Sequence, residues 1–188
     1  MINNSIPDFD HNFVTPPHKG NPTNRSDLSP YICTSIEFCE KFSTSTERIS
    51  ILKSFLTFRE LLTTYGMING FQWIDGSFLE NIEQLENRHP RDLDLVTIYW
   101  GYDINFQKQL VVKLPEFANP ILSKQNYKLD HYPVDAGYSP EVTVENTRYW
   151  TQLFSHNRSG VWKGMLSIAL NTPIEDANAL NYLQTLVP

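Results

Sequence analysis

Two aspartates that alternate with leucines, in the segment Asp92-Leu93-Asp94-Leu95, constrain this chain more than any other feature. Successive side chains on a β-strand point to opposite faces, so both carboxylates would lie on one face and both leucines on the other. The leucines would then join a core, while the acids sit side by side with no neutralising residue in the local sequence. Mg²⁺ is commonly bound by one or two carboxylates together with substrate phosphates. The segment therefore predicts a strand that carries a divalent-cation site.

A Gly76-Ser77 pair precedes these acids and lies between two predicted elements. Residues 71–75 form an apolar run typical of a short strand, and residues 78–85 have the apolar spacing of a helix. Backbone N–H groups at such a turn can bind a phosphate, because a helix N-terminus carries a positive partial charge. The alternative is an ordinary strand-to-helix turn with a serine cap.

Length and composition favour a globular protein with a substantial core. The chain has 188 residues, 40% of them hydrophobic, and a net charge of -6, which argues against broad, non-specific binding to a nucleic-acid backbone. The two cysteines, Cys33 and Cys39, are expected to be reduced thiols. The N-terminus is polar, and no apolar run has membrane-spanning length. We therefore expect a cytoplasmic protein with no membrane partner.

The predicted fold class is α+β (or α/β), with a small mixed β-sheet flanked by helices. Residues 1–30 contain five prolines and predict an extended arm, whereas residues 31–188 predict a single domain. Beyond the segments above, apolar patterns predict strands at 92–100 and 132–138, and either a strand or a helix at 165–170. Further helices are predicted at 34–42, 46–65, 106–114, 117–127, 146–155 and 176–186.

Other charged residues lie beside these motifs or on later predicted elements. Asp135, on the predicted strand 132–138, is one more acid, and Asp130 is its rival. Arg91 lies next to the acid pair, while Arg158 and Lys163 belong to a late loop; solvated loop charge is the alternative interpretation for both.

The order of these parts resembles the nucleotidyltransferase superfamily, which has the fold of DNA polymerase β and of antitoxin-type minimal nucleotidyltransferases. The superfamily pattern is an apolar strand, Gly-Ser, a spacer, Asp-apolar-Asp-apolar and a later apolar-Asp-apolar strand. Those parts here are Trp73-Ile74-Asp75-Gly76-Ser77, Asp92-Leu93-Asp94-Leu95 and Val134-Asp135-Ala136, and the spacer is slightly long. The IPDF start and the GFQWIDGSFLENIE and YWTQLFSHNRSGVWKGM blocks are similar to a bacterial family within that superfamily.

The resemblance implies a chemistry for each motif. Asp92, Asp94 and Asp135 would hold Mg²⁺ (or Mn²⁺), with Asp135 also accepting the hydroxyl proton. A set of nucleotide-binding residues would contact the triphosphate: Gly76, Ser77, Arg91, Arg158 and Lys163.

The implied reaction moves a nucleoside monophosphate from a nucleoside triphosphate to a hydroxyl on a protein or an RNA end. A toxin–antitoxin or antiviral (phage-defence) setting, with an operon-encoded protein partner, is expected by analogy with small bacterial members of the superfamily. The alternative is a catalytically degenerate nucleotidyltransferase-fold protein that acts as a partner-binding antitoxin or scaffold.

Overall fold

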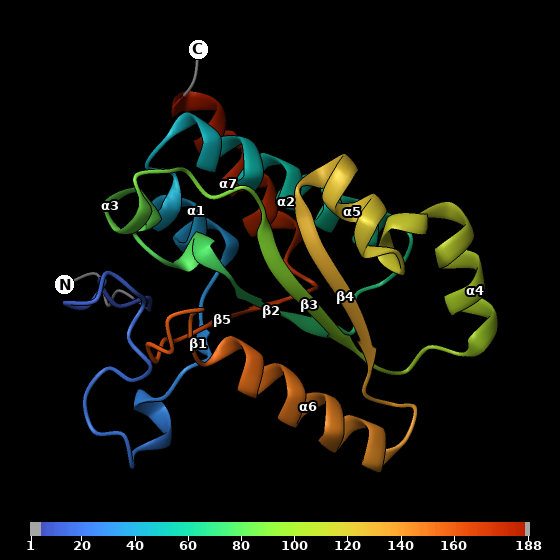
Figure 1. Ribbon diagram of the computed structural model, residues 1–188. Coiled ribbons are helices and arrows are strands. Elements are labelled where there is room, and N and C mark those ends of the chain that lie inside the picture. Colours follow the sequence, from blue (N-terminus) through green and yellow to red (C-terminus); the bar gives the residue numbers. More distant parts are fainter. Residues whose placement is uncertain (1–4, 187–188) are drawn as a thin grey trace.

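Five strands form one mixed sheet in a computed structural model that describes residues 5–186 (Figure 1). The strand order is β1-β5-β2-β3-β4; β2 is antiparallel to both of its neighbours, and the other two pairings are parallel. The strands are β1 (Tyr31–Ile32), β2 (Gly70–Asp75), β3 (Leu93–Tyr99), β4 (Leu129–Asp135) and β5 (Leu166–Ala169). The predicted α+β class, with a small mixed sheet flanked by helices, is confirmed.

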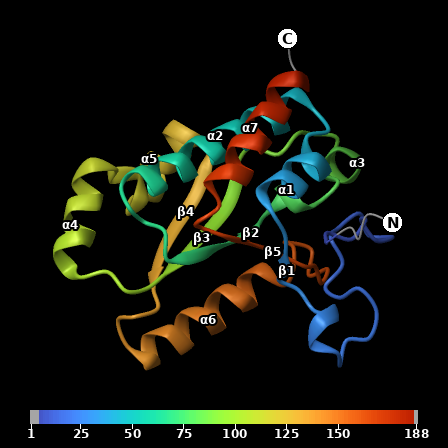
Figure 2. The ribbon, with the colours of Figure 1, turned by 180° about the vertical axis from the view of Figure 1, so that it is seen from behind.

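Helices cover the two faces of this sheet unequally. Helices α1, α2, α5 and α7 lie on one face and α6 lies on the other, as the two opposite views show (Figures 1 and 2). The helices are α1 (Ser35–Phe42), α2 (Thr46–Thr64), α3 (Ile82–Glu86), α4 (Ile104–Lys113), α5 (Pro120–Tyr127), α6 (Pro140–Phe154) and α7 (Pro173–Leu186). Helix α6 begins six residues before the predicted 146, because Ser139 caps it and Pro140 suits its first turn.

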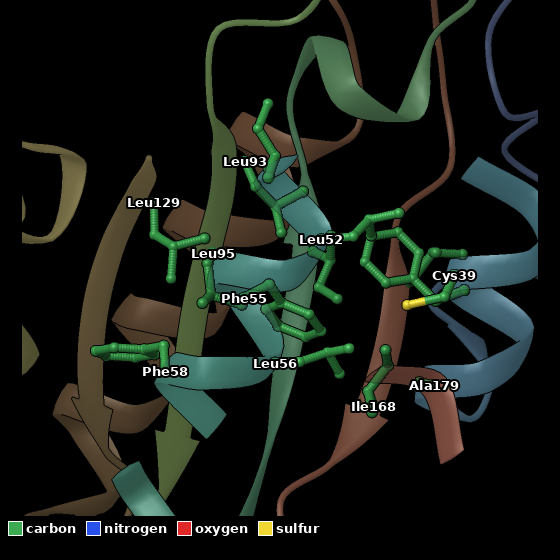
Figure 3. Close-up of a cluster of buried hydrophobic side chains, with 14 of the residues drawn as sticks. Cys39, Leu52, Phe55, Leu56, Phe58, Leu93, Leu95, Leu129, Ile168 and Ala179 are labelled. Carbon is green, nitrogen blue, oxygen red and sulfur yellow. The ribbon is translucent and has the colours of Figure 1, made fainter. Parts of the chain in front are cut away.

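The main core lies between α2 and the sheet. Leu52 and Phe55 of α2 point toward Leu93 and Leu95 of β3 in Figure 3, and all four side chains are fully buried. The leucines of the acidic segment thus face the helical layer, as their alternation predicted. Cys39 lies at the edge of the same cluster, and both cysteines are buried free thiols, as expected.

The opposite face of the sheet carries a smaller apolar cluster beneath α6. Trp150 and Phe154 of α6 pack with Val96 and Ile98 of β3 and with Val134 of β4. Because side chains alternate along a strand, Asp94 of β3 lies on this same face, just beyond the apolar cluster.

Strand β4 starts at Leu129, three residues before the predicted 132–138. Lys128 adopts the left-handed conformation (φ 57°) at the end of α5, and this turns the chain directly into the strand. Pro133 therefore sits inside the strand, where it is tolerated because β4 is an edge of the sheet and a missing N–H can face outward. Asp130 becomes a strand residue in consequence.

The predicted helix at 78–85 is replaced by a 3-10 turn (Ser77–Leu79) and the short helix α3. The backbone carbonyls that would accept hydrogen bonds within such a helix instead accept them from side chains of α2 and of the N-terminal arm. Arg48 of α2 donates to the carbonyls of Phe78 and Glu80, both at 2.7 Å, and Thr15 Oγ1 donates to that of Leu79 at 2.9 Å. Tertiary contacts therefore override the local helical spacing.

The described part of the proline-rich arm, residues 5–30, packs on the body. Ile6 and Val14 are buried against the body, while Phe13 stays 41% exposed. The Thr15 carbonyl accepts from the N–H of Gly164 at 2.7 Å, so the arm touches both the segment after Ser77 and the late loop. Residues 1–4 of the predicted arm lie outside the described residues.

Among the described helices, none combines the length and the apolar character needed to cross a membrane.

Candidate functional site

Three carboxylates meet at one end of the sheet because of strand register. Asp75 at the end of β2 pairs with Asp94 near the start of β3, and Asp94 pairs with Asp130 near the start of β4. Neighbouring strands lie about 4.8 Å apart, so these side chains are adjacent. Asp92, which directly precedes β3, is the fourth acid of this group.

Gly76 makes direct contact with Asp94. Its backbone has φ 84°, and a Cβ built on it would lie only 2.2 Å from Oδ2 of Asp94. A glycine is therefore required here for conformation and for space. The glycine of the Gly76-Ser77 turn allows the Asp94 carboxylate to lie against the main chain.

Asp94 is the least neutralised carboxylate of the group. Burial, followed by repulsion from Asp92 and Asp130, raises the pKa of its carboxyl to about 6. Its side chain forms no salt bridge with the residues at 5–186. A carboxylate in this environment gains stability from a cation.

Lys124 of α5 neutralises two of the other acids. Its Nζ lies 2.6 Å from Oδ2 of Asp92 and 3.5 Å from Oδ2 of Asp130. The hydrogen bond to Asp92 and the charges of both acids raise the pKa of Lys124 against the opposing effect of burial. This side chain is half-exposed, with 51% of its surface accessible. Sequence reasoning did not identify Lys124, because nothing near it in the chain marks its two partners.

Lys163 does not occupy the position expected of a phosphate ligand. It is buried, its Nζ lies 3.0 Å from Asp75 and 3.1 Å from Glu80, and it donates to the carbonyl of Gly76 at 2.8 Å. Burial lowers the pKa of Lys163, but the two carboxylates outweigh this effect and raise it. An ammonium with three partners at this depth is a fixed structural group, and it holds the main chain at Gly76 in place.

A pocket of about 540 Å³ opens beside the carboxylates. Ser77 and Gly76 line one side, and the end of α6 with the loop after it lines another. Arg158 of that loop and Arg88 supply positive charge, whereas Arg91 is exposed and is not part of the lining. The expectation for Arg91 is thus not met, since its neighbour Asp92 turns toward the pocket while Arg91 turns away.

Aromatic side chains complete the wall of the pocket. Tyr132 of β4 lies 5.1 Å from Trp150, and Tyr149 lies 4.9 Å from the same ring, measured between ring centroids. Tyr132 and Tyr149 remain 37% and 52% exposed, and both line the pocket.

The prediction that Asp135 joins Asp92 and Asp94 is wrong in this structure. Asp135 pairs with Tyr99, at the opposite end of β3, and accepts hydrogen bonds from Gln107 and the N–H of Gly137. Asp135 lies five residues further along β4 than Asp130, a span of about 16 Å. The earlier start of β4 gives the third position to Asp130, the rival candidate.

The carboxylate group suits a hard divalent cation by its donor chemistry. Oxygen ligands are those that Mg²⁺ and Mn²⁺ prefer, and Asp94 forms no salt bridge within the described part of the chain. Within residues 5–186, however, no three acids, histidines or cysteines are already arranged around a common metal position. Asp92 and Asp130 instead lie on either side of the Lys124 ammonium.

The fold and the site together define an α+β protein with a carboxylate-lined pocket at one end of a mixed sheet. The chain belongs to the family of unknown function DUF6932, whose model matches residues 7–169. That span runs from the arm to β5 and includes all residues that line the pocket. Searches of curated proteins and of solved structures found no match.

Proposed function

We propose that this protein is a metal-dependent nucleotidyltransferase that transfers a nucleoside monophosphate from a nucleoside triphosphate to a hydroxyl acceptor. One observation carries the proposal. The register of three strands brings Asp94 beside Asp130, and Gly76 of the Gly-Ser turn lies in contact with Asp94. The resemblance to the nucleotidyltransferase superfamily supports the same reading, with Asp130 in place of Asp135 as the third acid.

Asp92, Asp94 and Asp130 would hold Mg²⁺ or Mn²⁺. When bound, the ion supplies charge neutralisation for the triphosphate and lowers the pKa of the acceptor hydroxyl. The pocket carries an excess of negative charge that would repel a triphosphate in the absence of a cation. Its lining contains six acids, two arginines and two lysines, and both lysines are paired with acids.

The chain's own groups would position the nucleotide. The N–H of Ser77 follows Gly76 in a turn that has no side-chain cap, and it would donate to a phosphate oxygen. Arg158 would pair with the same phosphates, and Tyr132 or Tyr149 would stack on the base.

In the transfer step the acceptor oxygen bonds to the α-phosphorus while the bond to the β-phosphate oxygen breaks. Pyrophosphate leaves, and the hydroxyl proton passes to a carboxylate of the cluster. Asp130 takes over the acceptor role expected of Asp135, since Asp135 lies at the other end of β4.

A labelled-nucleotide assay tests the proposal. Purified protein is incubated with each of the four α-³²P-labelled triphosphates, Mg²⁺ and either cell protein or total RNA, and label transfer and pyrophosphate release are measured. We expect transfer by the wild type and by Asp135→Asn, and a loss of at least about 100-fold in Asp130→Asn. Equal transfer by Asp130→Asn would overturn the proposal. Release of inorganic phosphate in place of pyrophosphate would indicate a hydrolase.

A second candidate has a specific observation in its favour. Three of the four clustered acids, Asp75, Asp92 and Asp130, pair with Lys163 or Lys124, and no metal position is preassembled among the described residues. A catalytically degenerate protein that binds a partner, as an antitoxin or scaffold, would also have these features. The arm is a poor candidate for its docking segment, because residues 5–30 are already packed on the body.

The proposed setting follows from charge and from the resemblance. The net charge of -6 favours a protein acceptor over an RNA end, which would have to be held by a few basic side chains such as Arg158. We further propose a cytoplasmic, toxin–antitoxin or antiviral-defence role with an operon-encoded partner.

A further inference from the structure

We infer that Lys124 is an internal counter-ion of the carboxylate pocket, which a divalent cation must displace before it can bind Asp92 and Asp130 together. This inference rests on the proposed function, because it concerns the metal site of that function. It assigns to Lys124 a positioning role that no motif in the chain indicates.

The geometry of Lys124 carries the inference. A single ammonium lies within 2.6 Å of Asp92 and within 3.5 Å of Asp130, which come from the start of one strand and from its neighbour. These two acids are also the ones that flank Asp94 and raise the energy of its charged form. An ammonium and a divalent ion cannot share the same oxygen atoms, because both the space and the charge would conflict. An ion that bridges Asp92 Oδ2 and Asp130 Oδ2 therefore displaces the ammonium of Lys124.

A comparison with Lys163 shows why Lys124 is the exchangeable one. Lys163 is 2% exposed and has three partners, Asp75, Glu80 and the carbonyl of Gly76. Lys124 is 51% exposed, and its ammonium partners among the described residues are two carboxylates that line the pocket, Asp92 and Asp130. A lysine on a four-carbon stem with access to water can swing away at low cost. The pocket thus combines one fixed and one displaceable ammonium.

The displaced ammonium would stay near the pocket, since α5 fixes its main chain. Lys124 could then pair with a phosphate of the bound nucleotide, so that entry of the ion and recruitment of a phosphate-binding cation are coupled. Before the ion binds, the same ammonium lies against both Asp92 and Asp130.

Direct Mn²⁺ titration monitored by electron paramagnetic resonance tests the inference without any measurement of activity. The proteins are the wild type, Lys124→Met and the control Lys108→Met. Lys108 is an exposed residue of α4, which follows the end of β3 away from the pocket, so the control removes the same charge at a distance. Asp94→Asn defines the background. We expect Lys124→Met to bind Mn²⁺ about fivefold more tightly than the wild type, equivalent to about 1 kcal/mol for the lost competing ion pair. Lys108→Met should bind like the wild type.

A melting experiment supplies the second readout and also reports whether each variant is folded. Lys124→Met should melt below the wild type without metal, because Asp92 and Asp130 then repel each other, and Mn²⁺ should raise its melting temperature by more than that of the wild type. Equal or weaker Mn²⁺ affinity in Lys124→Met, with binding in the wild type, would overturn the inference and leave the proposed function standing. Absence of Mn²⁺ binding above the Asp94→Asn background in both proteins would overturn the metal site, and the inference with it.

Discussion

The carboxylate of Asp94 occupies the space that a side chain at Gly76 would need, with Oδ2 2.2 Å from the position of a Cβ. Two motifs that are separate in the sequence are thus parts of one contact. The Gly-Ser turn can follow β2 only with a glycine, and β3 can present Asp94 at this depth only if that glycine is there.

Gly76→Ala should therefore destabilise the protein by about 3 kcal/mol or more, through both strain at φ 84° and the clash with Asp94. Gly160→Ala is the matched control, because Gly160 also has a positive φ (76°) but has open space around it. The control should lose only about 1 kcal/mol. Urea unfolding measures both values, and equal losses would show that the contact with Asp94 is unimportant.

Arg48 should be among the most important single side chains for the geometry of the site. It is 2% exposed, bonds to Glu83 at 2.8 and 2.9 Å, and holds the carbonyls of Phe78 and Glu80. Arg48→Met leaves these groups without partners and should cost about 3 kcal/mol in urea unfolding. Arg148→Met removes an exposed pair on α6 and should cost less than about 0.5 kcal/mol. A small effect at Arg48 would contradict its assigned role.

A buried polar chain on the other face of the sheet gives a prediction remote from the pocket. Thr97 Oγ1 lies 2.8 Å from His131 Nε2 and accepts from Gln72 at 3.1 Å, and Gln72 in turn accepts from Arg59 at 2.7 Å. Thr97→Val keeps the shape but removes both contacts, so it should cost about 1–3 kcal/mol in urea unfolding. Thr57→Val, on the exposed side of α2, should be close to neutral; a similar loss there would refute the explanation.

Stability should depend on pH through Asp75. Burial raises the pKa of this carboxyl from 3.8 to about 7, so the folded protein binds more protons than the unfolded chain between these values. The free energy of unfolding should therefore fall as pH rises from about 4 to about 7, and Asp94, with a pKa of about 6, acts in the same direction. Asp75→Asn should flatten this part of the curve, as followed by urea unfolding at each pH. An unchanged slope would contradict the assignment.

Local sequence patterns predicted the orientation of the first two acids of the site but not the identity of the third. The alternation of Asp92-Leu93-Asp94-Leu95 predicted which side chains face the core, because that property depends only on strand geometry. The third acid was misplaced since the left-handed Lys128, which starts β4 early, is not visible in a hydrophobic pattern. One signal could have identified Asp130. It follows Leu129 and lies two residues before Tyr132, so in a strand that begins at Leu129 it shares a face with Tyr132.

Long-range contacts explain why two other predictions from the sequence differ from the structure. The helix expected at 78–85 fails because Arg48 and Thr15 take its carbonyls, and both residues lie at least 30 positions away in the chain. Lys163 is buried because Asp75 and Glu80 meet it there, across a separation of more than 80 residues. Such pairs form only in the folded protein, so local sequence patterns do not identify the partners.

We propose that Asp94 and Asp130, at one end of adjacent strands, form a site for a nucleoside triphosphate with a divalent cation. The most direct measurement is the change in melting temperature on addition of each triphosphate with Mg²⁺, for the wild type, Asp130→Asn and Asp135→Asn. We predict a rise of several degrees for at least one nucleotide in the wild type and in Asp135→Asn, and no rise in Asp130→Asn. A shift that survives in Asp130→Asn but disappears in Asp135→Asn, or no shift in the wild type with any nucleotide, would contradict the account.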